Sequence, residues 1–218
     1  NWRKVVISKL DWDREPNEVR STLFRKGLGR STGIGFPGER MGVWPSRAVL
    51  NKIEHATLAF GHGLSVTPLQ LAQAYIPIAS EGKFRHVSLL RQDEEVFANE
   101  VVAPRIAKQV LNMLKTVTER GGTATRAQVQ AYPTAGKTGT AHKVEKGGGY
   151  SPDRYVALFA GIAPVNDPRI VTVVIIDEPS TGHYFGGEAA APVFDKIAEG
   201  ALRLLNVAPL QGSEVALR

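Results

Sequence analysis

The stretch Ala135-Gly-Lys-Thr-Gly-Thr-Ala141 opens the part of the sequence that decides the fold. It begins a series of short runs that turn-forming residues separate, the pattern expected of an antiparallel meander. An apolar helical stripe follows the last run and can pack on such a sheet. We expect strands at 134–143, 155–163 and 170–177, turns at 147–153 and 166–168, and a helix carrying Val193, Phe194, Ile197, Ala201, Leu204 and Leu205.

The last of these runs, Ile170-Val-Thr-Val-Val-Ile-Ile176, is nearly all apolar. A strand without polar alternation is typical of a position that is covered on both faces. We therefore expect this strand to lie in the centre of the sheet. Strands that helices cover in this way predict an α+β fold with an antiparallel sheet.

Helical and glycine-rich segments alternate in the sequence before the meander. Capping residues, prolines at first helical positions and glycines after apolar stripes mark their ends. In chain order we expect a helix that ends at Gly27, a structured loop over 27–48, a helix from Pro68 to Gly82 capped by Ser65 or Thr67, short strands within 84–102, and a helix from Pro104 to Gly121-Gly122.

Composition restricts the classes of function. The net charge of +6 and the pI of 9.6 invite a nucleic-acid reading, but the basic residues are scattered and no basic block is present. The chain has no cysteine and no metal-type histidine spacing, so we expect neither a disulfide nor a metal site. No apolar run reaches the roughly 18 residues that cross a bilayer. The start at Asn1, without Met or signal sequence, suggests a piece of a longer protein.

The residues Lys137, Thr138 and Gly139 suit acyl-transfer chemistry. A lysine on an edge strand supplies positive charge beside an acylating serine, and a threonine hydroxyl can donate to a substrate carboxylate. Glycine lets a peptide backbone lie against the strand, and the N–H of Thr140 can stabilise an oxyanion. The order of motifs in serine acyl-transferases is S-x-x-K, S-x-N and K-T-G. Three residues also recur by chance, so an ordinary surface turn stays open as an alternative.

The other two motifs of that order are missing or misplaced. The one S-x-x-K, Ser80-Glu-Gly-Lys83, lies at the end of an expected helix, and we interpret it as a helix terminus. No S-x-N occurs, although Asn1 could be the last residue of one. The pair Asp177-Glu178 ends a strand, where neighbours point to opposite faces, so we expect no shared acid–base role.

Five separated segments together resemble class B penicillin-binding proteins, and particularly the septal peptidoglycan transpeptidases. The resemblance implies the fold of penicillin-binding protein transpeptidases and serine β-lactamases, present here in part. Residues 1–218 would be the C-terminal portion of one transpeptidase domain, and 207–218 a flexible tail. The segments are Gly33-Ile-Gly-Phe-Pro-Gly-Glu39, Gly61-His-Gly-Leu-Ser-Val-Thr-Pro-Leu-Gln-Leu-Ala-Gln-Ala-Tyr75, Gly121-Gly-Thr123, Ala135-Gly-Lys-Thr-Gly-Thr-Ala141 and Tyr184-Phe-Gly-Gly187.

The resemblance also implies roles for single residues. Lys137, Thr138 and Gly139 would form the third catalytic motif, and Thr140 would bind the carboxylate of the substrate or of a β-lactam. Aromatic residues further along the chain would line the cleft. For Tyr155 the alternative is packing in the core, whereas the glycines around Tyr184 and Phe185 indicate a loop position. These lining residues are Tyr155, Tyr184 and Phe185, with Gly186 beside them; His142 has no assigned role beyond a surface histidine.

The implied activity is that of a serine D,D-transpeptidase whose serine lies outside this chain, which alone would be inactive. That serine would attack a stem peptide ending in D-Ala-D-Ala, laid along 137–140, and the acyl group would pass to an amine of a neighbouring strand. The resemblance further implies acylation by β-lactams, no cofactor, division membrane proteins as partners, and a place on the periplasmic face of the inner membrane through an anchor outside this chain.

Two other interpretations stay open. The chain could be a non-catalytic fragment or degenerate paralogue that keeps only a structural or ligand-binding role. It could also belong to a D,D-carboxypeptidase or a serine β-lactamase, which share the three motifs. The segments G-F-P-G-E and T-P-L-Q-L-A favour the transpeptidase.

Overall fold

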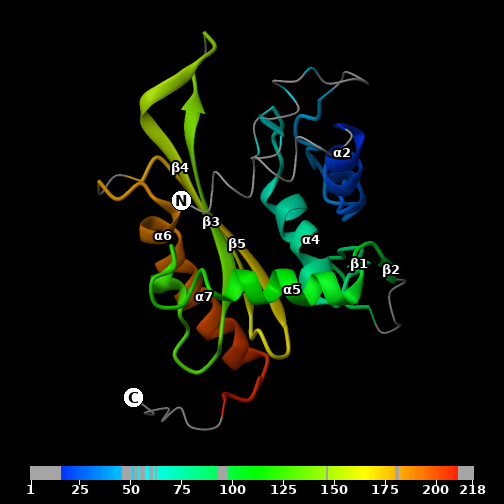
Figure 1. The fold of residues 1–218 in the computed structure, drawn as a ribbon, viewed down its shortest axis with the longest axis vertical. Coiled ribbons are helices and arrows are strands. Elements are labelled where there is room, and N and C mark those ends of the chain that lie inside the picture. Colours follow the sequence, from blue (N-terminus) through cyan, green and yellow to red (C-terminus); the bar gives the residue numbers. More distant parts are fainter. Residues whose placement is uncertain are drawn as a thin grey trace. The chain divides into compact units, whose positions relative to one another are not determined.

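The computed structural model describes residues 16–45, 51, 54, 57–58, 61, 63–92, 98–145, 147–179 and 182–210. The chain divides into two compact units. The first comprises Asn1–Ala74 and Phe84–Val101, and the second comprises Tyr75–Lys83 and Val102–Arg218. Figure 1 labels the helices and strands of both.

Helix α2 (Pro16–Arg25) opens the described part of the first unit, and helix α4 (Pro68–Ala79) begins in it. The start of α4 is a capping box. Thr67 Oγ1 accepts the Gln70 N–H at 3.1 Å, and Gln70 Oε1 accepts the Thr67 N–H at 2.8 Å. The predicted start of the helix at Pro68 is confirmed, and of the two expected caps, Ser65 and Thr67, it is Thr67 that caps it. The helix ends at Ala79, before the expected Gly82. The strands expected within 84–102 are the pair β1 (Lys83–Arg85) and β2 (Ala98–Glu100).

The predicted loop over 27–48 is irregular through its described part, and a carboxylate closes it. Glu39 accepts hydrogen bonds from the Ser31 hydroxyl at 2.6 Å and from the hydroxyl and N–H of Thr32 at 2.6 and 2.7 Å. These bonds favour the charged carboxylate and hold the pKa of Glu39 below its ordinary value, the Ser31 bond contributing most.

A buried amide ties the same loop to α4. Gln70 is 0% exposed, and its Nε2 donates to the carbonyls of Arg30 at 2.7 Å and Met41 at 3.1 Å. With its Oε1 engaged at the helix start, the side chain satisfies a donor and an acceptor in an otherwise dry place, as a buried amide must.

The second unit is built on an antiparallel sheet of β3 (Ala135–Val144), β4 (Tyr150–Ala163) and β5 (Ile170–Asp177), in the order β3-β4-β5. The predicted meander is confirmed. The turn expected over 147–153 was too long, because β4 already begins at Tyr150, which pairs with Val144. At this hairpin tip most side chains are exposed, so no apolar alternation marks the strand in the sequence.

The prediction that the apolar run 170–176 is the central strand was wrong. Among the described residues β5 pairs with β4 alone, and Ile175 is 39% exposed. In a meander the strand that comes second in the sequence lies between the other two, whatever its composition. The central strand is therefore β4.

Helices α5 (Pro104–Lys115), α6 (Gly186–Ala189) and α7 (Ala191–Leu204) complete this unit, with α5 against β3 and α7 against β4 and β5 (Figure 1). The rings of Phe159 and Phe194 meet edge to face at 4.9 Å in the core. The predicted α+β fold with helices on an antiparallel sheet is confirmed. Helix α5 ends at Lys115, before the expected Gly121-Gly122, and continues in turns.

The first residues of the expected tail are bonded to the body of the second unit. The Tyr132 hydroxyl donates to the carbonyl of Val207 at 2.7 Å, and the N–H of Leu210 donates to the carbonyl of Ala131 at 3.1 Å. The remaining tail residues, 211–218, lie outside the described residues.

Candidate functional site

Strand β3 carries the K-T-G residues at an edge of the sheet. In the described part of the chain its only strand neighbour is β4, in a register that pairs Thr138 with Phe159 and Gly139 with Leu158. The strand predicted over 134–143 is confirmed, so a surface turn is not the setting of these residues. An extended backbone at a sheet edge is the element to which a peptide can add as a further strand.

The motif residues divide between the two faces of β3. Successive side chains of a strand alternate, so Lys137 projects to one face while Thr138 and Thr140 share the other. Lys137 is exposed, and its Nζ donates to the carbonyl of Thr138 at 2.9 Å. The ammonium group thus lies beside the backbone of its own motif.

Each of the two threonine hydroxyls has a partner from a distant segment. Thr138 Oγ1 lies 3.2 Å from Thr123 Oγ1, and Thr140 Oγ1 accepts the N–H of Gly186 at 3.1 Å. The segments 121–123 and 184–187 therefore meet on one face of β3. Three of the five segments that resembled one family in the sequence are brought together here.

Glycines make this close packing possible. A Cβ on Gly139 would lie 2.7 Å from Leu158 Cγ, so the side chain of the paired strand already occupies that space. A Cβ on Gly186 would lie 2.2 Å from the carbonyl oxygen of Leu158, and one on Gly187 would lie 2.0 Å from that of Thr123. From the sequence, Gly139 was expected to let a substrate approach the strand. The packing of Leu158 against it requires a glycine at this position as well.

Aromatic side chains form a row beside the threonines. The rings of Tyr155 and Tyr184 stack with centroids 4.2 Å apart and planes 16° apart, and Phe185 follows at 4.5 Å from Tyr184. At the other end His142 lies 4.5 Å from Tyr155, with its Nδ1 2.7 Å from the carbonyl oxygen of Ser151. Phe185 is 53% exposed, and Tyr155 is half-buried in this row rather than part of the hydrophobic core.

A cluster of charged side chains, Lys143 with Asp177 and Glu178, was not predicted from the sequence. Lys143 Nζ contacts Glu178 at 2.6 Å and Asp177 at 3.0 Å, and these contacts, led by the bond to Glu178, raise the pKa of Lys143. Although neighbours on a strand point to opposite faces, both carboxylates reach Lys143, because Glu178 comes after the strand and has left the extended conformation, with φ of 49°. That the pair has no shared acid–base role stays a prediction. Partners 34 and 35 residues apart leave no local signal in the sequence.

Ser80 is not placed as a nucleophile. Its hydroxyl lies 2.7 Å from the carbonyl oxygen of Ile76 and 2.5 Å from that of Lys83, just after α4 ends. Lys83 is in β1, so the two residues share no helical face, and the interpretation as a helix terminus is confirmed. Asn1 lies outside the described residues.

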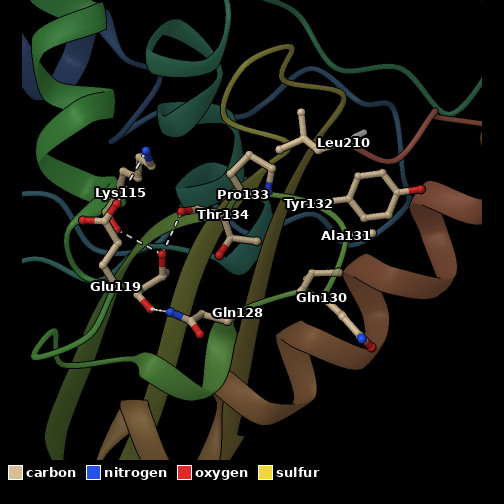
Figure 2. A pocket seen from close by; sticks show the side chains of 11 residues that line it. Lys115, Glu119, Gln128, Gln130, Ala131, Tyr132, Pro133, Thr134 and Leu210 are labelled. Carbon is tan, nitrogen blue, oxygen red and sulfur yellow. Dashed lines mark hydrogen bonds and ion pairs between the residues drawn. The ribbon is translucent and has the colours of Figure 1, made fainter. Parts of the chain in front are cut away.

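A pocket of about 540 Å³ lies at the N-terminal end of β3 (Figure 2). None of the predicted site residues lines it. Its polar side chains bond to their surroundings: Gln128 Nε2 donates to the Thr118 carbonyl at 2.7 Å, and the Thr118 hydroxyl donates to the Thr134 carbonyl at 2.8 Å. These bonds give the polar lining of this pocket a structural role, and the predicted site residues lie elsewhere, on and around β3.

The described residues contain no group of three or more His, Asp or Glu side chains that could hold a metal ion. Nor do they contain a helix of the length and apolar character that crossing a membrane requires.

Comparison with known proteins matches the sequence of this chain to one family. The model of the penicillin binding protein transpeptidase domain matches residues 3–199. The chain is 41% identical over 205 residues to "Peptidoglycan D,D-transpeptidase FtsI" of Escherichia coli (strain K12), covering 94% of the chain and 35% of that protein. It is 39% identical over 209 residues to "Probable peptidoglycan D,D-transpeptidase PbpC" of Pseudomonas aeruginosa, covering 96% and 37%.

A solved structure agrees in three dimensions. The "Apo structure of TP domain from Burkholderia pseudomallei penicillin-binding protein 3" superposes with a TM-score of 0.87 at 38% identity, covering 94% of this chain and 62% of that one. The chain spans about a third of the length of the curated relatives it matches. Because the family model covers most of the chain and the fold agrees, the chain belongs to the penicillin-binding protein transpeptidase family.

Proposed function

We propose that the protein is a D,D-transpeptidase that cross-links stem peptides during septal peptidoglycan synthesis, with its nucleophilic serine outside this chain. The observation that carries the proposal is the edge strand β3, on which Thr138 and Thr140 present hydroxyls on one face and Lys137 an ammonium group on the other. The names of the relatives in E. coli and P. aeruginosa support the same activity.

In the proposed reaction a D-Ala-D-Ala peptide lies along β3 as an added strand. The serine oxygen attacks the penultimate D-Ala carbonyl, and the proton that the serine hydroxyl loses passes to the nitrogen of the terminal D-Ala, which leaves with a free amine. An amine of a neighbouring stem peptide then attacks the acyl group and forms the cross-link, and the proton that this amine loses returns to the departing serine oxygen. A β-lactam enters the first step by opening its ring, and no leaving amine departs.

The residues of β3 have separate roles in this scheme. Lys137 supplies positive charge beside the serine, and Gly139 keeps the strand close to its neighbour. The backbone N–H of Thr140 stabilises the oxyanion, an effect worth about 10²–10³ in rate for one such donor. The hydroxyls of Thr138 and Thr140 bind the terminal carboxylate, which accepts hydrogen bonds only.

The aromatic row supplies the binding wall for the rest of the ligand. Tyr155, Tyr184 and Phe185 offer apolar faces beside the two threonines, and the exposed face of Phe185 can cover a β-lactam side chain. Gly186 contributes by packing: it is buried, and its N–H fixes the loop of this row to Thr140.

The cellular setting follows from the same proposal. A transpeptidase of the septum works on the periplasmic face of the inner membrane, held by an anchor outside this chain and in contact with division membrane proteins. The segments Gly33–Glu39 and Tyr184–Gly187, which resemble the septal subgroup, support this assignment.

Covalent labelling of the full-length protein with a fluorescent penicillin tests the function. We expect the wild type to be labelled, Lys137→Ala to lose labelling, and Lys108→Ala, an exposed lysine of α5, to keep it. The isolated 218-residue chain should not be labelled. An unlabelled full-length protein would support a non-catalytic paralogue.

Product analysis separates the remaining alternatives. Supplied with two stem peptides, a transpeptidase yields the cross-linked dimer with release of D-Ala. A D,D-carboxypeptidase yields only the shortened peptide, and a β-lactamase returns hydrolysed penicillin at many turnovers without dimer.

A further inference from the structure

The hydroxyl of Thr123 approaches the catalytic strand although it lies outside every helix and strand. Its Oγ1 is 3.2 Å from Thr138 Oγ1, across 15 residues of sequence. In the sequence, Gly121-Gly-Thr123 contributes only to the family resemblance, and no local pattern indicates a chemical role for Thr123. Its position against Thr138 therefore calls for a physical reason.

The backbone around Thr123 is fixed on both sides. After α5, the N–H of Gly122 donates to the Glu119 carbonyl and the N–H of Ala124 donates to the Val117 carbonyl, both at 2.9 Å. Ala124 is 1% exposed. On the other side Gly187 packs so closely that a Cβ there would lie 2.0 Å from the Thr123 carbonyl oxygen. A residue held in this way presents its hydroxyl in a defined place.

Counting protons decides how the two hydroxyls share their hydrogen bond. A threonine hydroxyl has one hydrogen to donate and two lone pairs that accept. A carboxylate only accepts, so Thr138 can bind it only with its own hydrogen. The contact with Thr123 must then use a lone pair of Thr138, and Thr123 must be the donor.

Thr140 shows the same arrangement with a backbone donor. Its Oγ1 accepts the N–H of Gly186 at 3.1 Å, which leaves the Thr140 hydrogen for another acceptor. Thr138 and Thr140 lie on one face of β3. With Thr123 as the donor to Thr138, each of the two hydroxyls accepts one hydrogen bond from the protein. The face therefore offers two O–H donors at once, which suits an anion and disfavours a neutral amide end that brings hydrogens of its own.

We propose that Thr123 is a positioning residue that donates to Thr138 Oγ1 and thereby turns the Thr138 hydrogen toward the terminal carboxylate of the ligand. The pair selects a carboxylate over a carboxamide or an ester at that end of the ligand. The assignment rests on the proposed function, because it concerns how that site reads its substrate.

The test uses the full-length protein and two probes, benzylpenicillin and its methyl ester. Thr123→Val removes the hydroxyl and keeps the shape, Thr123→Ser restores a hydroxyl, and Thr125→Val changes an exposed threonine two residues along the chain. We expect Thr123→Val to slow acylation by benzylpenicillin about tenfold, as the loss of one oriented bond to a charged group predicts. Acylation by the ester should change less, by about twofold, because its uncharged carbonyl accepts only the weaker neutral hydrogen bond.

The controls separate orientation from structure. Thr123→Ser should restore the rate with benzylpenicillin, and Thr125→Val should leave both rates unchanged. With Thr138→Val already present, Thr123→Val should add no further loss, because the two residues act through one bond. With a peptide substrate the loss should appear in KM for a C-terminal carboxylate and be smaller for a C-terminal amide.

Three outcomes would overturn the assignment. They are an unchanged rate in Thr123→Val, an equal loss with benzylpenicillin and its ester, and a failure of Thr123→Ser to restore the rate. Failure of the wild-type protein to be acylated is a different result, because it overturns the proposed function and this assignment with it. A thermal melt of each variant shows whether an equal loss comes from unfolding.

Discussion

Two regions of the molecule carry segments that resemble the family, and they are fixed in opposite ways. In the first unit the loop Gly33–Glu39 is held by polar side chains, the carboxylate of Glu39 and the buried amide of Gln70. In the second unit β3 is held by close packing that depends on missing side chains. Gly139 and Gly186 have no Cβ, so the neighbouring backbone and side-chain atoms approach to contact distance.

Because the two regions are held differently, different substitutions should destabilise each of them. A loop held by hydrogen bonds to a few polar atoms is sensitive to truncation of those side chains and to the protonation of a carboxylate. A strand held by close packing is sensitive to the addition of a single methyl group. The predictions below test this contrast in the full-length protein.

The largest effect should come from adding a methyl group at Gly186. Gly186→Ala would place a Cβ 2.2 Å from the Leu158 carbonyl oxygen and 2.6 Å from that of Gly139, both backbone atoms that cannot turn aside. We expect a loss of about 3 kcal/mol in the free energy of unfolding and strongly reduced labelling by penicillin. Denaturant titration and labelling rates measure the two effects.

The matched control is Gly200→Ala in α7, where a Cβ meets no atom within 4 Å. This variant should be stabilised by about 0.5–1 kcal/mol, since alanine loses less backbone entropy than glycine in a helix. If Gly186→Ala were as stable as Gly200→Ala, the idea that β3 depends on missing side chains would be wrong.

Truncation of Gln70 should have the next largest effect. Gln70→Ala leaves the carbonyls of Arg30 and Met41 without their donor in a buried setting, which should cost about 2 kcal/mol. Hydrogen exchange of the amides at 30–41 should speed up. Gln109→Ala, on an exposed position of α5, should change stability by less than about 0.5 kcal/mol. Equal effects of the two substitutions would remove the contrast between the regions.

A smaller loss of stability is expected at Gly139, and a second substitution should remove it. The Cβ of Gly139→Ala would meet the side chain of Leu158 at 2.7 Å, and a side chain can shift where a carbonyl cannot, so the loss should be about 1 kcal/mol. In a Leu158→Ala background the same substitution should have almost no effect on stability. A cost that persists in that background would place the clash with the backbone instead.

The smallest effect is a pH dependence confined to the loop of the first unit. Because the folded pKa of Glu39 is lowered, its hydrogen bonds stabilise the loop fully above its ordinary pKa of 4.5 and are lost as the pH falls through the lower folded value. Amides near Ser31 and Thr32 should exchange faster below that range, after correction for intrinsic rates. Glu39→Gln should show no such pH dependence. An identical profile in both proteins would contradict this origin.

Local features of the fold were predictable because their causes lie within a few residues. The start of α4 follows from Thr67, Pro68 and Gln70, which form one capping box within a single turn. The bounds of β5 were predicted because an apolar run ends at a charged pair. The position of β5 at the edge was not predicted. Composition indicates how buried a strand is, whereas the order of the strands along the chain decides which strands are neighbours in this sheet.

The candidate site was predictable in its residue types and not in its contacts. K-T-G could be placed on an edge strand from the sequence, but the partners of its hydroxyls, Thr123 and Gly186, depend on which loops return over which strand. The same holds for Lys143, whose carboxylate partners lie at the end of a later strand. Long-range pairing of polar groups has no periodicity, so no local pattern indicates it.

An open strand edge that can pair with a peptide can equally pair with the same strand of another copy, and such edges are sites where aggregation begins. Two features of β3 act as guards. In self-pairing, Lys137 would face a like charge wherever Lys137 or Lys143 of the second copy lies opposite it, and the irregularity between His142 and Val144 interrupts the ladder near the hairpin tip. The ammonium group of Lys137, to which the proposed function gives a role in the reaction, therefore also disfavours pairing of β3 with a second copy.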